Sequence, residues 1–314
     1  MKSMKSKNNK QTRSRFKKAE LIFIWGMLAL PILDWLIFFL GKNISSFTMA
    51  FQNLSGEWSL INFKDFYDSL IAPTSDLGSF GIALKNTLKY FLLGNIVNLP
   101  LQLIFSYFLY KQIRGYKVFR IIFYFPVIVS AVAMTGVFKE FISPLGPLGE
   151  ICRKAGIEFP MSGLLGQPST ATTTIMVYEV WTCVGFNMLL ICGAMARIPT
   201  EVLEAARLDG IGTWRELVQI VLPMIWSTLS TILILGATGI LSSSGPILLL
   251  APDTGSLGTT TISFWIFDKV YANGGYMKGQ YNLVSAAGLC LTVIMVPIVL
   301  LLRRLIEKVG NVEY

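Results

Sequence analysis

The stretch EAARLDGIGTWRELVQIVLP, Glu204–Pro223, is the most polar segment lying between two long apolar runs of the chain. Its local pattern predicts two short helices separated by a break. Together these helices would form an L-shaped element that stands off a membrane. Ala205 and Ala206 would give this element a small surface that another protein can approach closely.

The first helix of the element is predicted from its start signals. Thr200 is expected to cap the helix, and Glu201 falls in the opening turn, where negative charge suits a helix N-terminus. Glu204 and Arg207 are three residues apart, so their side chains can pair on one face of the helix.

The break and the second helix have signals of their own. Gly210 follows Asp209 at a position where a left-handed residue would end a helix. Thr213 and Glu216 have the S/T-x-x-E spacing of a capping box, which predicts the start of a second helix. Pro223 is expected to kink that helix near the point where it enters the next apolar segment.

The composition is that of a polytopic membrane protein rather than a soluble globular one. The chain has 314 residues, of which 53% are hydrophobic and 14% charged, and its mean hydropathy is +0.59. It has no histidine, the commonest general base and metal ligand, which argues against an enzyme. The four cysteines show no metal-ligand spacing and are interpreted as small packing residues.

A membrane-spanning helix needs about 20 mostly apolar residues. Six segments meet this requirement: Leu21–Leu40, Lys89–Tyr110, Arg120–Phe138, Thr173–Met195, Val221–Leu241 and Val284–Leu302. The predicted fold is therefore an all-α membrane protein. Its expected parts are a basic tail (1–19), a first span with an outer loop (20–82), a core (83–305) that contains the loop 197–223, and a C-terminal tail (306–314).

The positions of the basic residues predict the orientation of these spans. Most of the 27 Lys and Arg residues lie in the N-terminal tail, the 111–120 loop, the 196–219 loop and the C-terminal tail. Cytoplasmic loops are the ones enriched in Lys and Arg. Both termini and the Glu204 element are therefore expected on the cytoplasmic side, with outer segments at about 41–82, 142–170 and 242–283.

Motifs for nucleotide hydrolysis, metalloprotease, serine hydrolase and zinc chemistry are absent from the sequence. The chain is therefore not expected to hydrolyse ATP, to act as an enzyme, or to bind a cofactor or metal ion itself. The energy for transport would come from a partner or from an ion gradient. A docking surface on the cytoplasmic side is what such a subunit would need.

Polar residues inside the predicted spans are candidates for a solute path. Glu179 and Asn187 would share one face of the fourth span, as a path lining or as an interhelix contact. Asn95, Asn98 and Gln102 form a polar stripe on the second span, which either lines a wet cavity or joins helices.

Two stretches near the predicted outer side are also notable. The run Ser242–Pro246 would break the fifth span, and Ser243 and Ser244 are candidates for the path or an outer gate. The aromatic-rich run Thr260–Tyr271 could form a helix lying at the membrane interface, with its Trp and Tyr residues either in the aromatic belt or in contact with a partner.

The Glu204 element also resembles a known motif. Its residues match the EAA motif (EAA, three residues, Gly, nine residues, I-x-L-P) of the permease subunits of binding-protein-dependent ABC importers, at Glu204, Ala205, Ala206, Gly210, Ile220, Leu222 and Pro223. Other pieces are similar to the sugar-permease branch of that family: Asn86–Leu88, Ser106–Tyr110, Phe123–Pro126 and Gly193–Pro199.

The resemblance implies a type I importer permease fold (MetI-like), with a five-helix core and an extra first helix that embraces a second permease chain. It implies that the EAA helix sits in a cleft of a cytoplasmic ATPase, with Glu204 in polar contacts, Asp209 nearby and Gly210 permitting the turn. An extracellular binding protein would deliver a sugar or oligosaccharide, and the chain would be a multi-pass protein of a bacterial cell membrane.

Other interpretations remain open from the sequence. The cargo could be a non-sugar solute such as glycerol-3-phosphate or a peptide. A gradient-driven secondary transporter would instead predict inverted sequence halves and an ion site in the middle of the membrane, and neither is evident.

Overall fold

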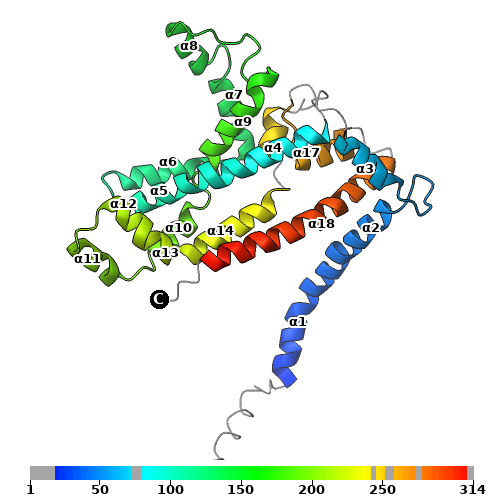
Figure 1. The fold of residues 1–314 in the computed structure, drawn as a ribbon, viewed down its shortest axis with the longest axis horizontal. Helices are drawn as coiled ribbons and strands as arrows, with labels where there is room; N and C mark the ends of the chain where they lie inside the picture. Colours follow the sequence, from blue (N-terminus) through cyan, green and yellow to red (C-terminus); the bar gives the residue numbers. More distant parts are fainter. Residues whose placement is uncertain (1–17, 72–78, 242–244, 252–257, 273–277, 310–314) are drawn as a thin grey trace, which may run out of the picture.

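The computed structural model describes residues 18–71, 79–241, 245–251, 258–272 and 278–309, and the elements in these ranges are helices (Figure 1). Four helices are long and apolar enough to cross a membrane: Ile22–Ala50, Phe80–Tyr110, Pro168–Met195 and Gln280–Lys308. Two further pairs pass the same test together but are sharply bent: Tyr116–Ile128 with Ala131–Phe141, and Thr213–Met224 with Trp226–Gly239. The predicted all-α membrane fold is confirmed, with up to six spans.

Most spans are built from several helical segments. In chain order these are α1 (Lys18–Asp34), the π-helix η1 (Trp35–Leu40) and α2 (Gly41–Ala50); α4 (Phe80–Leu92), η2 (Leu93–Asn98) and α5 (Leu99–Tyr110); α6 (Tyr116–Ile128) and α7 (Ala131–Phe141); α9 (Pro168–Cys183) and α10 (Met188–Met195); α12 (Thr213–Glu216), η3 (Leu217–Val221), α13 (Leu222–Met224) and α14 (Trp226–Gly239); and α18 (Lys278–Val309). The connecting helices are α3 (Ile61–Ile71), α8 (Pro147–Lys154), α11 (Thr200–Leu208), α15 (Gly245–Leu250), α17 (Ile262–Phe267) and η4 (Asp268–Ala272).

Two predicted spans differ from the helices expected from their hydropathy, one in its bend and one in its length. The third is bent by 107° between α6 and α7, because Val129 and Ser130 adopt extended backbone. The first was expected to end at Leu40, but its helix continues through Pro31 to Ala50. Hydropathy reports how much apolar sequence is present, and it does not report where the backbone turns.

The buried core is divided along the length of the molecule. At the α11 end, one cluster joins α5, α10 and α14 through Tyr107, Met195 and Leu229. Towards the opposite end, Phe80 of α4 contacts Phe66 of α3 and Trp265 of α17 edge-on, with ring centroids 5.0 and 5.1 Å apart. Figure 1 shows α11 and α12 far from α3 and α17.

The predicted interfacial helix at Thr260–Tyr271 is helical but is not a surface helix. Ile262, Phe264 and Trp265 of α17 are all buried. The extended residues before it are held by α4, because the Asn86 side-chain amide donates to the carbonyl oxygens of Gly258 (2.8 Å) and Thr260 (3.0 Å). Phe264 and Trp265 therefore pack within the protein core, so α17 is not the interfacial helix that was expected, whereas Tyr271 in η4 is 68% exposed.

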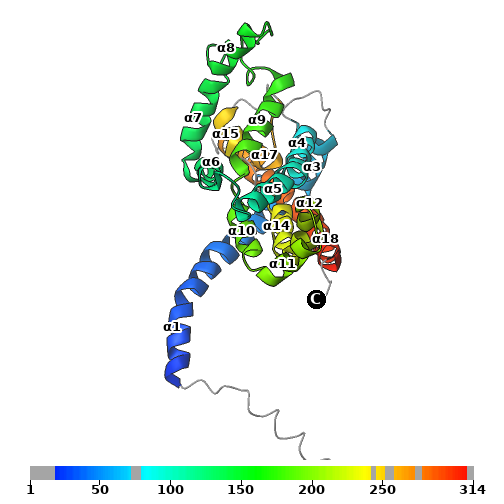
Figure 2. The same cartoon turned by 90° about the vertical axis from the view of Figure 1, so that its left-hand side faces the viewer.

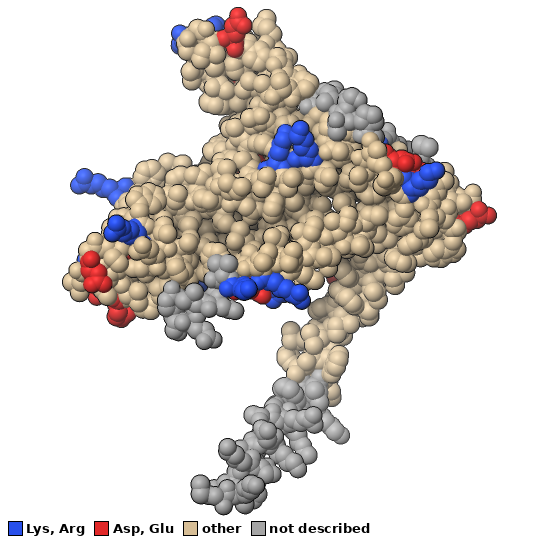
Figure 3. Space-filling view, in the orientation of Figure 1, with Lys and Arg blue, Asp and Glu red and all other residues tan. Residues whose placement is uncertain are grey.

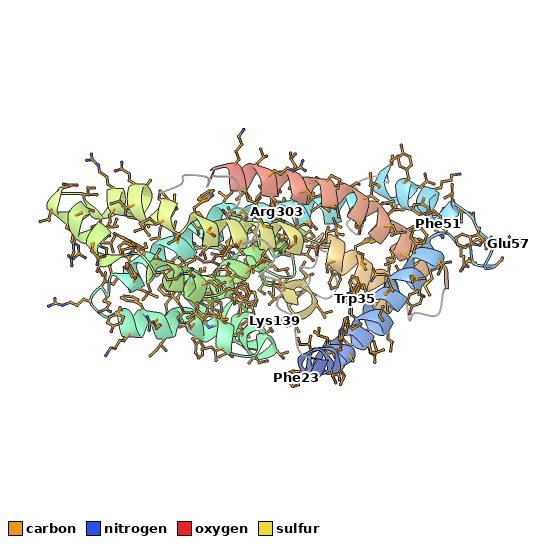
Figure 4. All side chains as sticks on the ribbon, turned by 90° about the horizontal axis from the view of Figure 1, so that it is seen from below. Phe23, Trp35, Phe51, Glu57, Lys139 and Arg303 are labelled. Atoms are coloured by element: carbon orange, nitrogen blue, oxygen red, sulfur yellow. The ribbon has the colours of Figure 1, made fainter. Side chains whose placement is uncertain are left out.

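The N-terminal helix α1–η1–α2 stands apart from the other spans. None of the residues in its apolar window is buried, and Phe23 and Trp35 are 67% and 52% exposed. It meets the bundle where α2 packs against α18, and it then diverges from the rest of the molecule (Figures 2 and 4). Such an apolar surface is stable against lipid or against another apolar protein surface.

The outer surface of the bundle fits the same environment. Figure 3 shows that, on the face in view, Lys, Arg, Asp and Glu lie mostly near the margins, with a broad uncharged area between them. Many large apolar side chains of α6 and α18 are exposed, among them Ile121 (68%) and Val293 (72%). This distribution matches a helix bundle immersed in a bilayer.

A close helix approach at Gly185 provides a test of the packing. A Cβ atom at Gly185 would lie 2.2 Å from the carbonyl oxygen of Phe123 in α6, whereas a Cβ at Gly193 in α10 would have nothing within 4 Å. Gly185→Ala should therefore lower the midpoint of thermal unfolding in detergent, with a cost of about 1–3 kcal/mol. Gly193→Ala is the matched control and should be neutral or slightly stabilising. Equal midpoints for the two variants would contradict this packing.

Candidate functional site

The sequence element at Glu204–Pro223 forms α11, α12, η3 and α13, which together are called the α11–α13 element. α11 begins after Pro199, which occupies the cap position. Thr200 is the first residue of the helix, and no side chain forms a capping hydrogen bond there. The predicted Thr200 cap is therefore wrong, because proline already presets the extended backbone that a cap residue needs. Glu201 does lie in the first turn, as expected.

The end of α11 is confirmed at Gly210, which has a φ of +71°. The N–H of Gly210 donates to the carbonyl of Arg207 (3.1 Å), and the N–H of Ile211 donates to the carbonyl of Ala206 (3.0 Å). With Asp209 as the C-cap residue, this pair of bonds is a Schellman motif, in which glycine avoids the strain of the left-handed conformation. The chain turns sharply here and starts α12.

The predicted capping box at the start of α12 is wrong. Gly212 holds the cap position, and Glu216 does not reach back to it. Instead, the Glu216 carboxylate forms an ion pair with Lys111 Nζ, just beyond the end of α5. The Glu216 side chain is only 5% exposed and that of Lys111 is 18% exposed, so the pair is largely removed from water. Burial against α5 decides the direction of this side chain.

Tyr107 of α5 completes the contact between the two helices. It is 1% exposed, and its hydroxyl donates to the carbonyl oxygen of Thr213 (3.2 Å). The Lys111 ammonium also lies over the Tyr107 ring, 5.6 Å from its centroid. Hydrogen bond, ion pair and ring contact together fix α12 to the end of α5.

The α11–α13 element has an inner and an outer face. Leu203 and Ala206 are buried (6% and 4% exposed), and Leu203 belongs to the core cluster at this end. The predicted surface of Ala205 and Ala206 is therefore wrong at Ala206, which faces the core of this chain. Glu204 and Ala205 are exposed, and within the described residues Glu204 forms no ion pair with Arg207. The predicted pairing is therefore wrong, and the carboxylate of Glu204 is left facing outward.

Large apolar side chains on the same element are also exposed. They are Leu208 (89%), Trp214 (58%) and Val218 (57%). Exposed apolar residues beside outward-facing polar ones are typical of a surface that binds another protein. The structure thus provides an exposed surface on an element that is firmly attached to the core.

The last part of the element leads into a span. Ile220 and Leu222 pack against the core cluster, and Pro223 lies in the short helix α13. The helix axis then turns by 74° before α14, at Ile225. A bend is therefore present close to the predicted place, but it lies at Ile225 (φ −99°, ψ 8°), two residues beyond Pro223. The ring and missing N–H of Pro223 act on the preceding turn, which is the π-helix η3.

A second feature is a polar cavity of about 210 Å³ between α4–α5, α9–α10 and α14. Its polar lining includes Thr87, Asn95, Asn98, Gln102, Glu179 and Asn187. The structure thus brings the predicted polar stripe of the second span (Asn95, Asn98 and Gln102) together with Glu179 and Asn187, the two candidates of the fourth span. Ser243 and Ser244 lie outside the described residues.

Part of this polar lining joins the helices. Asn187 donates its side-chain amide to Gln102 Oε1 (3.0 Å), and Gln102 donates to the carbonyl of Cys183 (2.7 Å). Asn187 lies in the turn between α9 and α10 rather than on the helix that carries Glu179, but both face the same cavity. The stripe therefore serves both roles that the sequence left open.

Several groups on the cavity wall have no hydrogen-bond partner. Among the described residues these include Glu179 Oε2, Asn98 Oδ1 and the hydroxyl of Tyr90. The π-helix η2 supplies Gly94, Asn95 and Asn98 to the wall, and such π segments occur often at functional sites. Within the described ranges, no group of three or more His, Cys, Asp or Glu side chains could hold a metal ion.

Sequence reasoning missed the residues that secure the α11–α13 element. Lys111 and Tyr107 lie far from Glu216 in the chain, and nothing local distinguishes Lys111 from the other basic residues around it. A usable signal was present at Glu216. It precedes the partly buried Ile220 by one helical turn, which places a carboxylate on the inner face of the helix.

The buried pair predicts a large effect of one substitution. Lys111→Met leaves the Glu216 carboxylate buried without a counter-ion, so we expect a loss of about 3–5 kcal/mol of stability, measured as a lower unfolding midpoint. The double variant Lys111→Met with Glu216→Leu should recover most of that loss.

The control for this test is the exposed pair of Arg303 with Glu307. Arg303→Met should change stability by no more than about 1 kcal/mol. If Lys111→Met and Arg303→Met shift the midpoint equally, the buried pair does not secure the element.

Comparison with known proteins agrees with this arrangement. Residues 103–310 match the family model described as "Binding-protein-dependent transport system inner membrane component". The diacetylchitobiose uptake system permease protein NgcF of Streptomyces coelicolor is 30% identical over 62% of this chain, a match that spans 56% of that protein. The multiple sugar-binding transport system permease protein MsmF of Streptococcus mutans is 24% identical over 90% of this chain and 95% of its own length.

A solved structure shares the fold. A chain in the crystal structure of a bacterial alginate ABC transporter, in complex with a periplasmic protein bound to an alginate pentasaccharide, superposes with a TM-score of 0.79. It covers 96% of this chain and 99% of its own length at 22% identity. The chain belongs to the family of inner-membrane components of binding-protein-dependent transport systems.

Proposed function

We propose that this chain is one transmembrane permease subunit of an ATP-driven importer, and that it forms half of a path for a sugar or oligosaccharide. The observation that carries the proposal is the α11–α13 element. It exposes Glu204 and Ala205 on its outer face, while the buried pair of Lys111 with Glu216 fixes its inner side to the spans. A surface that is both accessible and rigidly attached can receive force from a separate subunit.

The separate subunit would be a cytoplasmic ATPase. The sequence contains no phosphate-binding Gly-x-x-x-x-Gly-Lys-Ser/Thr motif, so ATP would be bound and hydrolysed by the partner, with no cofactor on this chain. The basic N-terminal tail and the basic residues Lys111, Arg114 and Lys117 favour an orientation with this end in the cytoplasm. The α11–α13 element would then face the compartment that contains ATP.

Movement of this element would reach the solute path through α14. The bend at Ile225 leads directly into α14, which lines the polar cavity with Ile232, Gly236 and Gly239. A push on the α11–α13 element would therefore be transmitted to α14 and, through the pair of Lys111 with Glu216, to α5, and both helices line the cavity. In the proposed importer, this movement would switch the path between inward- and outward-facing states.

A second permease chain and a binding protein complete the proposal. The apolar helix Ile22–Ala50 has no buried residue in its apolar window, so its surface is available to a second permease chain within the membrane. The relatives named above are a diacetylchitobiose and a multiple-sugar system, which favours a carbohydrate cargo delivered by an extracellular binding protein. Amide and carboxyl groups around the cavity suit a hydroxyl-rich solute.

Two substitutions test the coupling role. Glu204→Lys reverses the outward charge, and Gly210→Pro demands a φ near −65° where the backbone has +71°. Both variants should abolish ATP-dependent uptake in cells while the protein still inserts in the membrane at normal levels. The measurements are uptake of labelled oligosaccharides and quantitative blotting of membranes.

Gly212→Pro is the matched control, because Gly212 has φ −72° and ψ 158°, which proline adopts without strain. This variant should retain uptake. Wild-type rates of uptake in both Glu204→Lys and Gly210→Pro would overturn the coupling role.

A further inference from the structure

The polar cavity contains one acidic side chain and, among the described residues that line it, no Lys or Arg. Building on the function proposed above, we propose that this chain's half of the path admits hydroxyl-bearing solutes that are neutral or cationic and excludes anionic ones such as phosphate esters and uronates. Glu179 is the residue that determines this specificity.

The surroundings of Glu179 leave its carboxyl group in need of a hydrogen-bond donor. Its Oε2 atom is buried and has no partner, and the neighbouring Thr182 hydroxyl donates instead to the carbonyl of Tyr178 (3.0 Å). Glu179 takes part in none of the ion pairs formed by the described residues. A carboxyl group at this depth is retained where it faces a partner or a water-filled path.

The amides around the cavity add neutral hydrogen-bonding groups to this wall. Asn187 donates one N–H to Gln102 Oε1, and Gln102 donates one N–H to the carbonyl of Cys183. Asn95 donates one N–H to the carbonyl of Phe91 (2.8 Å), and Asn98 Oδ1 accepts no hydrogen bond. Acceptor oxygens are therefore available beside Glu179, and the only formal charge that the described lining residues can carry is the negative charge of Glu179.

A wall with one carboxyl group and no cationic side chain selects by the charge of the solute. Hydroxyl and ammonium groups bring donors that pair with Glu179, Asn95 and Asn98. A phosphate or carboxylate brings further acceptors, and it would lose its water without gaining a cationic partner. Ionised Glu179 would add direct repulsion, and an arriving cation would favour the ionised form. Anions are therefore disfavoured by the ionised carboxylate and by the lack of a cationic side chain among the described lining residues.

The test places a thiol probe in the cavity. Gly236 lines it, and a Cβ there would lie 3.7 Å from Asn95 Oδ1, an ordinary contact. The probe is Gly236→Cys in the full-length chain with the native cysteines replaced by Ala, because Cys183 also lines the cavity. Membranes containing the chain and its partner subunits are solubilised at about pH 8, where more of the thiol is the reactive thiolate.

Three methanethiosulfonates are compared: a cationic trimethylammonium reagent, an anionic sulfonate reagent and a neutral methyl reagent. In each case the thiolate attacks the sulfenyl sulfur, a disulfide forms and methanesulfinate leaves. Rates are divided by those for a small free thiol, which removes the intrinsic differences between reagents. We expect the cationic reagent to react faster than the anionic one by on the order of tenfold.

Glu179→Gln should bring that ratio close to one, because it removes the charge and keeps the shape. The control is Glu140→Gln, which removes an exposed carboxylate of α7 that does not line the cavity, and it should leave the ratio unchanged. An anionic reagent as fast as the cationic one, or a ratio that Glu179→Gln does not alter, overturns the inference. So does a probe thiol that fails to react even with the neutral reagent.

The labelling needs neither nucleotide nor solute, so its result is separate from that of the uptake test. If the chain that retains Glu179 shows no charge preference but supports ATP-dependent uptake, only the inference about solute charge is refuted. A preserved charge preference without ATP-dependent uptake refutes the proposed importer function.

Discussion

The arrangement of this protein depends on the buried ion pair between Lys111 and Glu216. Removing two charges from water costs several kcal/mol for each ion, and the cost is offset only when the geometry is good. Here the pair lies beside Tyr107, whose hydroxyl also binds the backbone of α12. These contacts make the end of α5 and the start of α12 behave as one body, so the exposed surface of α11 is attached to a span rather than to a flexible loop.

That attachment gives the two candidate sites a common structural basis. The Schellman turn at Gly210 sets the direction of α12, and the bend at Ile225 sets the direction of α14. α14 in turn supplies one wall of the polar cavity, next to the π-helix η2. In the proposed importer, a push on α11 would act on the cavity wall through helices and buried contacts, without a long loop that could absorb the movement.

The chain by itself leaves much apolar surface uncovered. The helix Ile22–Ala50 diverges from the bundle, and exposed apolar residues also lie on the α11–α13 element. Lipid suits the first of these surfaces as well as a protein does, whereas the second carries charged residues beside the apolar ones. The first surface is therefore suited to the membrane interior, and the second to a protein in water. This difference fits a subunit that has partners both within the membrane and beside it.

The sequence by itself determined the class of fold, the approximate spans, the left-handed turn at Gly210 and the bend after Pro223, because these follow from hydropathy and from backbone limits of single residues. It also identified the polar side chains that line the cavity. The tertiary structure alone decided that Glu216 pairs with Lys111 instead of capping its own helix, and that the helix after Thr261 is buried. The physical reason is that burial and ion pairing join residues far apart in the chain, and local signals carry no information about such partners.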